Sequence, residues 1–307
     1  MVPQNSSPPY SLSLPESLRE ASIWMDGAPV PPTGAVVSVF DRGFLYGDSV
    51  FETLRTYGGR PFAARAHVDR LVQSAAKVFI DLPVSPEQFL AEIERACAER
   101  RTPELYLRLM LTRGVGSLGL DPGAATSPLR VLIATPLAPP PPEVYRDGIA
   151  VVTYRVPRLA DHTEASGAKL GNYLVAVLAT RKAAEASAKE ALIVDGTERV
   201  LEGATSNVFW VDERGVLGTP GLDAGILDGI TRRHVLEVAR EQGRVVTERT
   251  PLLSELERAR EVFISSSVRE LLPVVRVDGK PIGDGRPGPV TQGLLAAFRA
   301  HCARIVG

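Results

Sequence analysis

Apolar residues recur along the chain with two spacings, one typical of strands and the other typical of helices. Short runs rich in Val, Ile, Leu and aromatic residues predict strands, and segments in which apolar residues return every three or four positions predict helices. The predicted strands are residues 36–40, 49–57, 60–62, 104–113, 129–135, 149–154, 191–195, 206–211, 262–265 and 271–277. The predicted helices are residues 66–80, 86–100, 172–187, 230–242 and 290–304, with a polar loop at 157–168.

Strands and helices alternate through the whole chain, which indicates the α/β (α+β) class. The Gly58-Gly59 pair predicts a hairpin turn, and Asp278-Gly279 predicts another turn. Four consecutive prolines at 139–142 favour an extended, semi-rigid spacer. We therefore predict, in order, a disordered extension (1–20), a small N-terminal domain (21–137), a linker (138–146) and a larger C-terminal domain (147–307).

Composition and charge exclude several classes of protein. A chain of 307 residues is long enough for two hydrophobic cores. The formal net charge of −1 gives no reason to expect nucleic acid or an anionic membrane as a partner. No apolar run reaches the roughly 18–20 residues that span a bilayer. The first 20 residues lack the basic flank and apolar centre of a signal peptide.

Cysteine and histidine usage adds two expectations. Cys97 and Cys302 are far apart and form no disulfide framework, which suits a reducing compartment, so we expect a cytoplasmic protein. The histidines show no spacing typical of metal ligands, so we expect no structural metal. They are His67, His162, His234 and His301.

A glycine-rich segment, Gly114 to Gly119, matches the GxGxxG spacing of dinucleotide-binding loops. Such a site also needs a helix that begins inside the loop and meets the pyrophosphate. Here Asp121-Pro122-Gly123 follows and breaks any helix, so we predict a loop and no nicotinamide site. The chain also lacks a GxSxG elbow and a phosphate-binding P-loop, the usual signatures of many hydrolases and kinases.

Lysine is scarce, and one of the five lysines stands out. Lys77 and Lys182 lie in predicted helices with polar neighbours, Lys189 lies just after one, and Lys280 follows a turn, so all four are typical of surface positions. Lys169 instead lies between small residues directly before an apolar helix. A lysine beside an apolar element can have a lowered pKa and react as a nucleophile with carbonyls. Lysines at loop–helix junctions are usually surface residues, so Lys169 alone does not decide the function.

A pyridoxal 5'-phosphate (PLP) site needs an anion pocket, a carboxylate for the ring nitrogen and a donor for the ring oxygen besides the lysine. Gly229-Ile230-Thr231 begins a predicted helix, whose free N–H groups suit a phosphate. Ser265-Ser266-Ser267 ends a strand, and Glu202 follows an apolar run. Each has a plain structural alternative, as a helix cap, a turn or an exposed charge. Their joint presence favours the PLP site.

Six sequence blocks, in order and over about residues 22–299, resemble the fold-type IV PLP enzymes. This group contains the branched-chain aminotransferases, the D-amino-acid aminotransferases and the aminodeoxychorismate lyases. The blocks are residues 41–55, 62–71, 169–174, 201–209, 227–232 and 263–273. Asp228 stands where the family commonly has proline, and Ser265-Ser266-Ser267 replaces a frequent Thr-Gly-Thr. The resemblance implies two domains, the larger C-terminal one being a pseudo-barrel.

The resemblance also implies roles for individual residues. Lys169 would carry PLP as a Schiff base and move the α-proton of the substrate. Glu202 would keep the ring nitrogen protonated, Tyr173 would bind the ring oxygen and Arg65 would bind the phosphate. The other residues expected to bind the cofactor are Asn207, Leu227, Ile230, Thr231, Ser266 and Ser267.

The substrate is expected to contact Tyr46, Phe51, Thr53, Tyr106, Arg108 and Val268. Tyr106 and Arg108 lie two positions apart on a predicted strand and therefore share a face. In branched-chain aminotransferases such a pair contacts the substrate carboxylate, including that of 2-oxoglutarate. The resemblance thus implies amino transfer between a branched-chain-like amino acid and a 2-keto acid such as 2-oxoglutarate.

Several alternatives stay open. The lyases have a threonine at the position of Thr53 and a loop like Arg113-Gly114-Val115-Gly116, so aminodeoxychorismate lyase remains an alternative. A D-amino-acid or (R)-amine transaminase is another. Intact Lys169 and Glu202 argue against a binding protein that has lost turnover. We also expect a homodimer, as in the family, with Tyr46 reaching into the neighbouring subunit.

Overall fold

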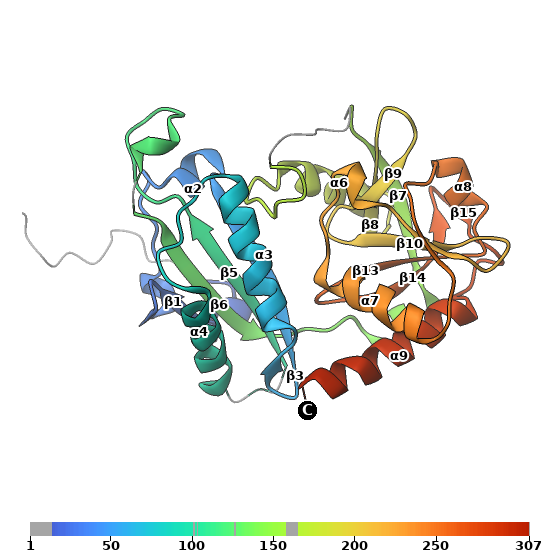
Figure 1. Ribbon diagram of the computed structural model, residues 1–307, viewed down its shortest axis with the longest axis horizontal. Coiled ribbons are helices and arrows are strands. Elements are labelled where there is room, and N and C mark those ends of the chain that lie inside the picture. Colours follow the sequence, from blue (N-terminus) through green and yellow to red (C-terminus); the bar gives the residue numbers. More distant parts are fainter. Residues whose placement is uncertain (1–13, 101, 103, 126, 158–164, 307) are drawn as a thin grey trace, which may run out of the picture.

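The computed structural model describes residues 14–306 except 101, 103, 126 and 158–164, and its strands form two sheets (Figure 1). The first sheet is antiparallel, in the order β2-β1-β6-β5-β3-β4. Its strands are β1 (Ser22–Met25), β2 (Ala28–Val30), β3 (Ser49–Tyr57), β4 (Arg60–Pro61), β5 (Leu105–Thr112) and β6 (Leu129–Pro136). The helical segments around it are α1 (Glu16–Arg19), η1 (Pro32–Gly34), α2 (Arg42–Tyr46), α3 (Ala64–Lys77), α4 (Pro86–Ala98) and η2 (Pro122–Ala124).

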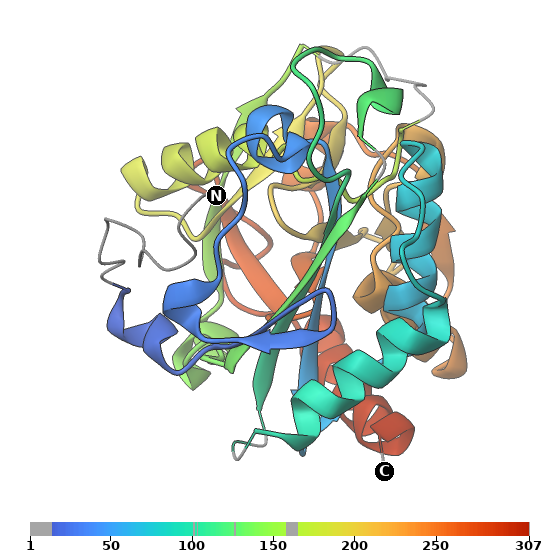
Figure 2. The same cartoon turned by 90° about the vertical axis from the view of Figure 1, so that its left-hand side faces the viewer.

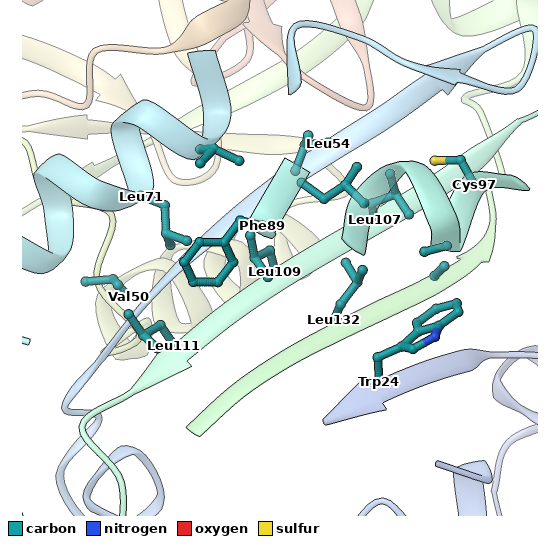
Figure 3. Close-up of a cluster of buried hydrophobic side chains, with 14 of the residues drawn as sticks. Trp24, Val50, Leu54, Leu71, Phe89, Cys97, Leu107, Leu109, Leu111 and Leu132 are labelled. Carbon is teal, nitrogen blue, oxygen red and sulfur yellow. The ribbon is translucent and has the colours of Figure 1, made fainter. Parts of the chain in front are cut away.

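Helices α3 and α4 cover one face of the first sheet (Figure 2), and an apolar cluster fills the space between them (Figure 3). Helix α3 contributes Leu71 and helix α4 contributes Phe89, which meet Leu107 and Leu109 of β5. Because side chains alternate along a strand, the residue before each of these leucines points to the opposite face. Tyr106 and Arg108 therefore lie on the face of the first sheet that is turned away from the apolar cluster.

The second sheet has nine strands, with parallel and antiparallel pairs, in the order β12-β11-β10-β13-β14-β7-β8-β9, and β15 pairs with β14. The strands are β7 (Ile149–Arg155), β8 (Glu190–Val194), β9 (Val200–Gly203), β10 (Asn207–Val211), β11 (Leu217–Thr219), β12 (Val246–Glu248), β13 (Glu261–Ser266), β14 (Glu270–Val277) and β15 (Lys280–Pro281). The helical segments are α5 (Pro142–Asp147), α6 (Leu174–Glu185), η3 (Leu222–Ala224), α7 (Ile230–Glu241), α8 (Leu253–Glu257) and α9 (Pro289–Val306).

Both faces of the second sheet are covered by helices. Along β10, Val208 and Trp210 pack in the cluster that includes α8, whereas Phe209 packs in the cluster formed with α7 and α9. Phe209 stacks on Phe263 with ring centroids 4.8 Å apart. A strand buried on both faces consists of consecutive apolar residues, and for this reason the sequence predicts a strand at β10.

The α/β class is confirmed, and the long predicted strands and helices are present within a few residues of their expected bounds. The predicted strand at 36–40 is wrong, because this segment turns and exposes Val36, Val39 and Phe40. Five strands of three or four residues, β1, β2, β9, β11 and β12, were not predicted, since they are too short for a periodic pattern.

Other expectations meet the structure in part. The proposed spacer 138–146 is helical from Pro142 onward, with that proline at the first helical position. Residues 16–19 are helical although an extension without structure was predicted, and residues 1–13 lie outside the described part. Within the predicted loop 157–168, residues 158–164 also lie outside it. The two sheets divide the chain between β6 and β7, and the domain boundaries stay a prediction.

The glycine-rich segment 114–119 is a loop, as predicted, and leads to η2 rather than to an α-helix. Among the helices of the described residues, none is both long and apolar enough to cross a membrane.

Candidate active site

A cavity of about 860 Å³ is lined by residues from both halves of the chain. Strands β3 and β5 contribute Phe51, Thr53, Tyr106 and Arg108, from the face of the first sheet that is turned away from its apolar core. The second half contributes the segment around Lys169, the end of β9, the start of α7 and the turn after β13. The cavity therefore brings together most of the residues predicted from the sequence.

The segment that carries Lys169 is bound to the start of β3. The Phe51 N–H donates to the Lys169 carbonyl over 3.1 Å, and the Gly171 N–H donates to the Ser49 carbonyl over 2.7 Å. A Cβ atom at position 171 would lie 2.0 Å from the Ser49 hydroxyl, so a larger residue here would force the Ser49 side chain to move. Backbone hydrogen bonds from both sides thus fix the position of Lys169.

The Lys169 side chain is half-buried in a partly aromatic environment. Its Nζ lies 3.4 Å from the Tyr173 hydroxyl and 4.6 Å from the centroid of the Phe51 ring. Burial, together with the positive charge of Arg70, lowers the pKa of Lys169 to about 8. A larger fraction of this amine is therefore neutral at physiological pH than for an ordinary lysine, and the neutral form is the nucleophile.

An anion site lies at the start of helix α7. The first residues of this helix, Ile230 and Thr231, line the cavity, and the N-cap residue Gly229 has no side chain that could cap their backbone N–H groups. Arg70 of α3 also lines the cavity and donates to the Asp228 carbonyl, just before the helix, over 2.8 Å. A guanidinium beside an uncapped helix N-terminus suits a phosphate.

Arg65, the arginine predicted to bind the phosphate, does not line the cavity. It pairs with Asp69 at 2.9 Å and Glu87 at 3.3 Å, and its side chain is 60% exposed. Positions 65 and 70 are five residues apart on one helix, which separates their side chains by roughly 140° around the axis. Arg70, and not Arg65, therefore lies in the cavity beside the start of α7.

Arg70 is held by a buried carboxylate on β3. Its Nε and Nη2 donate to the two oxygens of Glu52 over 2.7 Å each, and His67 Nδ1 lies 2.7 Å from the same carboxylate. Burial alone would raise the pKa of Glu52, but Arg70 and His67 lower it to about 2. Burial also lowers the pKa of His67, which favours a neutral imidazole that donates from Nδ1. Neither Glu52 nor Arg70 was among the site residues predicted from the sequence.

Glu202 and Asn207 organise the segment that leads into α7. The Glu202 carboxylate accepts from the Leu227 N–H over 3.2 Å, and the Asn207 side-chain amide donates to the Leu227 carbonyl over 2.8 Å. A Cβ atom at Gly229 would lie 2.0 Å from the Asn207 side-chain oxygen. All four residues line the cavity, so the chain path here depends on tight packing around Asn207.

The serines at the end of β13, Ser265 and Ser266, and the next residues, Ser267 and Val268, also line the cavity. Ser266 Oγ accepts from the Arg269 N–H over 3.3 Å. Ser265 Oγ is buried, and no hydrogen-bond partner for it exists among the described residues. Buried hydroxyls without a partner are uncommon, so an acceptor such as a phosphate oxygen would complete this site. Ser265 was not among the expected ligands; only its place at a strand end pointed to it.

The predicted substrate residues divide into two groups. Phe51, Thr53, Tyr106 and Arg108 line the cavity, with the Arg108 guanidinium 4.0 Å from the centroid of the Phe51 ring. Tyr46 lies outside the cavity on α2, where its hydroxyl accepts from the Gly119 N–H over 3.1 Å.

Other arginines of the cavity have carboxylate partners, which distinguishes them from Arg108. Arg155 pairs with Glu198, Arg199 with Asp195 and Arg269 with Glu190. Within the part of the chain that the structure describes, no ion pair forms at Arg108. Its charge is available to an anionic ligand.

Comparison with known proteins identifies the family to which this chain belongs. The family model for amino-transferase class IV matches residues 49–277. A Methanocaldococcus jannaschii protein, provisionally designated a branched-chain-amino-acid aminotransferase, is 39% identical over 277 residues, covering 90% of this chain and 95% of that protein. The D-alanine aminotransferase of Bacillus licheniformis is 35% identical over 268 residues, covering 86% and 90%.

Similar solved structures indicate the same family as these relatives. The branched-chain amino acid aminotransferase of Escherichia coli superposes with a TM-score of 0.86 at 32% identity, covering 91% of this chain and 93% of that one. The branched-chain aminotransferase of the archaeon Thermoproteus uzoniensis, solved with norvaline, superposes with a TM-score of 0.83 at 28% identity, covering 92% and 94%. With a family match over most of its length and this fold, the chain belongs to the class IV aminotransferases and is a transaminase.

Proposed function

We propose that this transaminase uses PLP bound in the cavity and moves the amino group of a branched-chain-like amino acid to a 2-keto acid such as 2-oxoglutarate. The observation that carries the proposal is a half-buried lysine of lowered pKa in the same cavity as an arginine and a helix N-terminus whose N-cap residue is a glycine. This combination fits a ligand with both a carbonyl carbon and a phosphate.

Each part of the cofactor has a matching group in the cavity. The phosphate would be held by Arg70 and by the backbone N–H groups of Ile230 and Thr231. The serine hydroxyls at the end of β13 would add further hydrogen bonds. Glu202 would accept a hydrogen bond from the ring nitrogen and keep it protonated. Tyr173 would donate to the ring oxygen, because burial and the nearby Glu202 charge raise the pKa of this phenol to about 12 and keep it protonated.

When bound, PLP supplies an electron sink for the electrons left behind as the α-proton of the amino acid departs. Lys169 would carry the cofactor covalently. Once the substrate amine has displaced it, Lys169 would take the α-proton of the amino acid in the first half-reaction and deliver a proton to the α-carbon of the keto acid in the second. The Tyr173 hydroxyl, 3.4 Å from Nζ, would orient the amine during this transfer.

The substrate side of the cavity is both apolar and cationic. Phe51 offers an apolar wall, and Arg108 offers a charge without a carboxylate partner in the described part of the chain. A guanidinium binds a carboxylate through two parallel hydrogen bonds. This arrangement supports a substrate that combines a carboxylate with an apolar side chain, and a dicarboxylate acceptor.

A D-amino-acid donor is the second candidate, favoured by the similarity to the D-alanine aminotransferase of Bacillus licheniformis. The side chains named above bind the same chemical groups in either stereoisomer. Assays with L-leucine, L-valine, D-alanine and an (R)-amine, each with 2-oxoglutarate, decide between the donors. Release of pyruvate from aminodeoxychorismate in a parallel assay would instead indicate the lyase.

The cofactor assignment has its own test. The purified protein should absorb visible light, and borohydride reduction followed by peptide mapping should place the label on Lys169. A colourless protein that incorporates no PLP would refute the assignment.

We also propose that the active form is a homodimer. Apolar side chains lie exposed on α2, in the loop 114–120 and on α6, for example Phe44 at 69% and Val177 at 58%. The end of α2 lies against the start of α6, since a Cβ atom at Gly47 would lie 3.2 Å from Asn172 Cβ. Exposed apolar surface that is contiguous commonly marks an interface, and a second copy of the chain would cover it.

A further inference from the structure

Three side chains with metal-binding atoms meet where helix α7 packs against helix α9. His234 and Glu237 belong to α7, and His301 belongs to α9. His234 Nδ1 lies 3.0 Å from His301 Nε2 and 3.4 Å from Glu237 Oε2. His301 Nε2 and Glu237 Oε2 are 3.8 Å apart. None of the three residues lines the active-site cavity.

These three separations match the face of a metal-centred tetrahedron. A tetrahedral Zn²⁺ with bonds of about 2.0–2.1 Å holds its ligand atoms about 3.3–3.4 Å apart. The observed separations of 3.0, 3.4 and 3.8 Å lie on both sides of this value. Shifts of a few tenths of an ångström would therefore place all three atoms at bonding distance from one cation.

The two helices hold the ligands in place before any cation arrives. His234 and Glu237 are three positions apart on α7 and so project from the same face. The apolar cluster that joins the helices includes Leu236 of α7 with Leu294 and Phe298 of α9. Ligands on packed helices lose little further freedom on binding, which favours affinity.

The site is closed on one side and open on the other. The His301 side chain is 6% exposed, whereas that of Glu237 is 53% exposed. A cation can thus enter from solvent beside Glu237, and three protein ligands leave a fourth position for water. Two imidazoles and one carboxylate suit Zn²⁺, Ni²⁺ or Cu²⁺ better than Mg²⁺ or Ca²⁺, which prefer oxygen ligands alone.

One neighbouring group competes with the cation. Arg304 Nη2 lies 3.2 Å from His301 Nδ1, and an arginine can only donate. The proton of His301 then sits on Nε2, which donates to His234 Nδ1. Metal binding moves that proton to Nδ1 and displaces Arg304, whose side chain is mostly exposed and also lies 3.5 Å from Glu241.

We propose that His234, Glu237 and His301 form a binding site for a first-row divalent cation of the Zn²⁺ type, which clamps the C-terminal helix α9 to α7. Because α7 begins at the cavity, the clamp stabilises the helix that carries Ile230 and Thr231. The sequence predicted no metal site, since His234 and His301 are 67 positions apart and only the fold brings them together.

The test is a titration of the chelator-treated holoenzyme with Zn²⁺ by calorimetry, and with Co²⁺ by visible absorption. We expect saturation at one cation per chain and a raised melting temperature, since a ligand of the folded state alone stabilises it. The variants Glu237→Gln and His301→Gln should each weaken binding by at least about 10- to 100-fold, the loss that even an outer-shell partner causes.

Two further variants separate this site from other metal binding. Glu87→Gln alters an exposed, arginine-paired glutamate on α4 and should leave the affinity for Zn²⁺ unchanged. Arg304→Gln removes the competitor and should tighten binding. Glu237 is exposed, so its variant is expected to fold even where His301→Gln does not. Absence of saturable binding, or equal affinity in wild type and Glu237→Gln, overturns the proposal.

Discussion

Glu52 binds Arg70 through two hydrogen bonds of 2.7 Å each, and this pair connects the core of the first sheet to the start of helix α7. The remaining Nη1 of Arg70 donates to the Asp228 carbonyl over 2.8 Å. Two of the three guanidinium nitrogens are thus directed at a fixed carboxylate, which orients the whole group. In the proposed cofactor site, Glu52 would act through Arg70 as a positioning residue.

Loss of this carboxylate should lower stability. Glu52→Gln leaves the buried Arg70 charge without its partner, and breaking a buried ion pair on one side costs about 3–5 kcal/mol. The pKa of Glu52 is lowered to about 2, so its stabilisation is present above the ordinary glutamate range and is lost as the pH falls toward 2. Urea unfolding between pH 7 and pH 3 should show a smaller loss of stability for Glu52→Gln than for wild type. Identical slopes would contradict the assignment.

The proposed phosphate contact of Arg70 can be tested with two arginines of the same helix. Arg70→Met should weaken the affinity for PLP by about 10- to 100-fold, because a charge-assisted contact contributes about 1.5–3 kcal/mol. Its affinity for unphosphorylated pyridoxal should change far less. Arg65→Met, on the exposed side, serves as the control and should bind both ligands like wild type. Cofactor titrations followed by absorbance give both affinities, and the reverse ranking of the two variants would restore Arg65.

The reactivity of Lys169 should follow its lowered pKa. Only the neutral amine attacks an aldehyde, so the rate at which the apoprotein reacts with pyridoxal should rise with pH and level off above about pH 8. An ordinary lysine would still gain reactivity up to about pH 10. Arg70→Met removes a positive neighbour and should shift the midpoint upward. Stopped-flow absorbance over this pH range measures the midpoint, and a wild-type value near 10 would show that the amine is not desolvated.

The proposed dimer depends on exposed apolar surface. Phe44→Glu and Val177→Glu place charges within the patch on α2 and α6, where desolvation opposes pairing of two copies. We expect both variants to shift from dimer to monomer in light scattering and to lose activity together with the dimer. Val245→Glu, which changes an exposed apolar residue before β12, is the matched control and should remain dimeric. A wild-type protein that is monomeric and fully active would exclude the dimer.

Short sequence motifs were enough to predict much of this site. Lys169, Glu202 and the start of α7 each belong to a motif whose local sequence is distinctive, and all three line the cavity. Arg65 and Arg70 belong to one block of one helix, and only burial, which a single sequence does not reveal, separates them. The His234–His301 pair depends on how two helices pack, so no local pattern could have indicated it.

Arg108 should select substrates that carry a carboxylate. Within the described residues it has no ion pair, and its guanidinium lies over the Phe51 ring in the cavity. Arg108→Met removes a bidentate contact that contributes about 1.5–3 kcal/mol, which corresponds to a roughly 10- to 100-fold loss in kcat/KM. Every 2-keto acid has one carboxylate, so the variant tests whether this arginine binds the common group or the second carboxylate of 2-oxoglutarate.

The two possible roles of Arg108 predict different ratios between the losses of kcat/KM for a dicarboxylate and for an apolar keto acid. If Arg108 binds the second carboxylate, 2-oxoglutarate loses far more efficiency than 4-methyl-2-oxopentanoate, and we expect this result. The matched control is Arg155→Met, because Arg155 also lines the cavity but is already paired with Glu198 at 2.9 Å. It should leave both efficiencies near those of wild type. Equal losses for the two keto acids in Arg108→Met, at an unchanged melting temperature, would assign Arg108 to the carboxylate that all substrates share. Equal losses with earlier melting would instead indicate a structural role through its contact with Phe51.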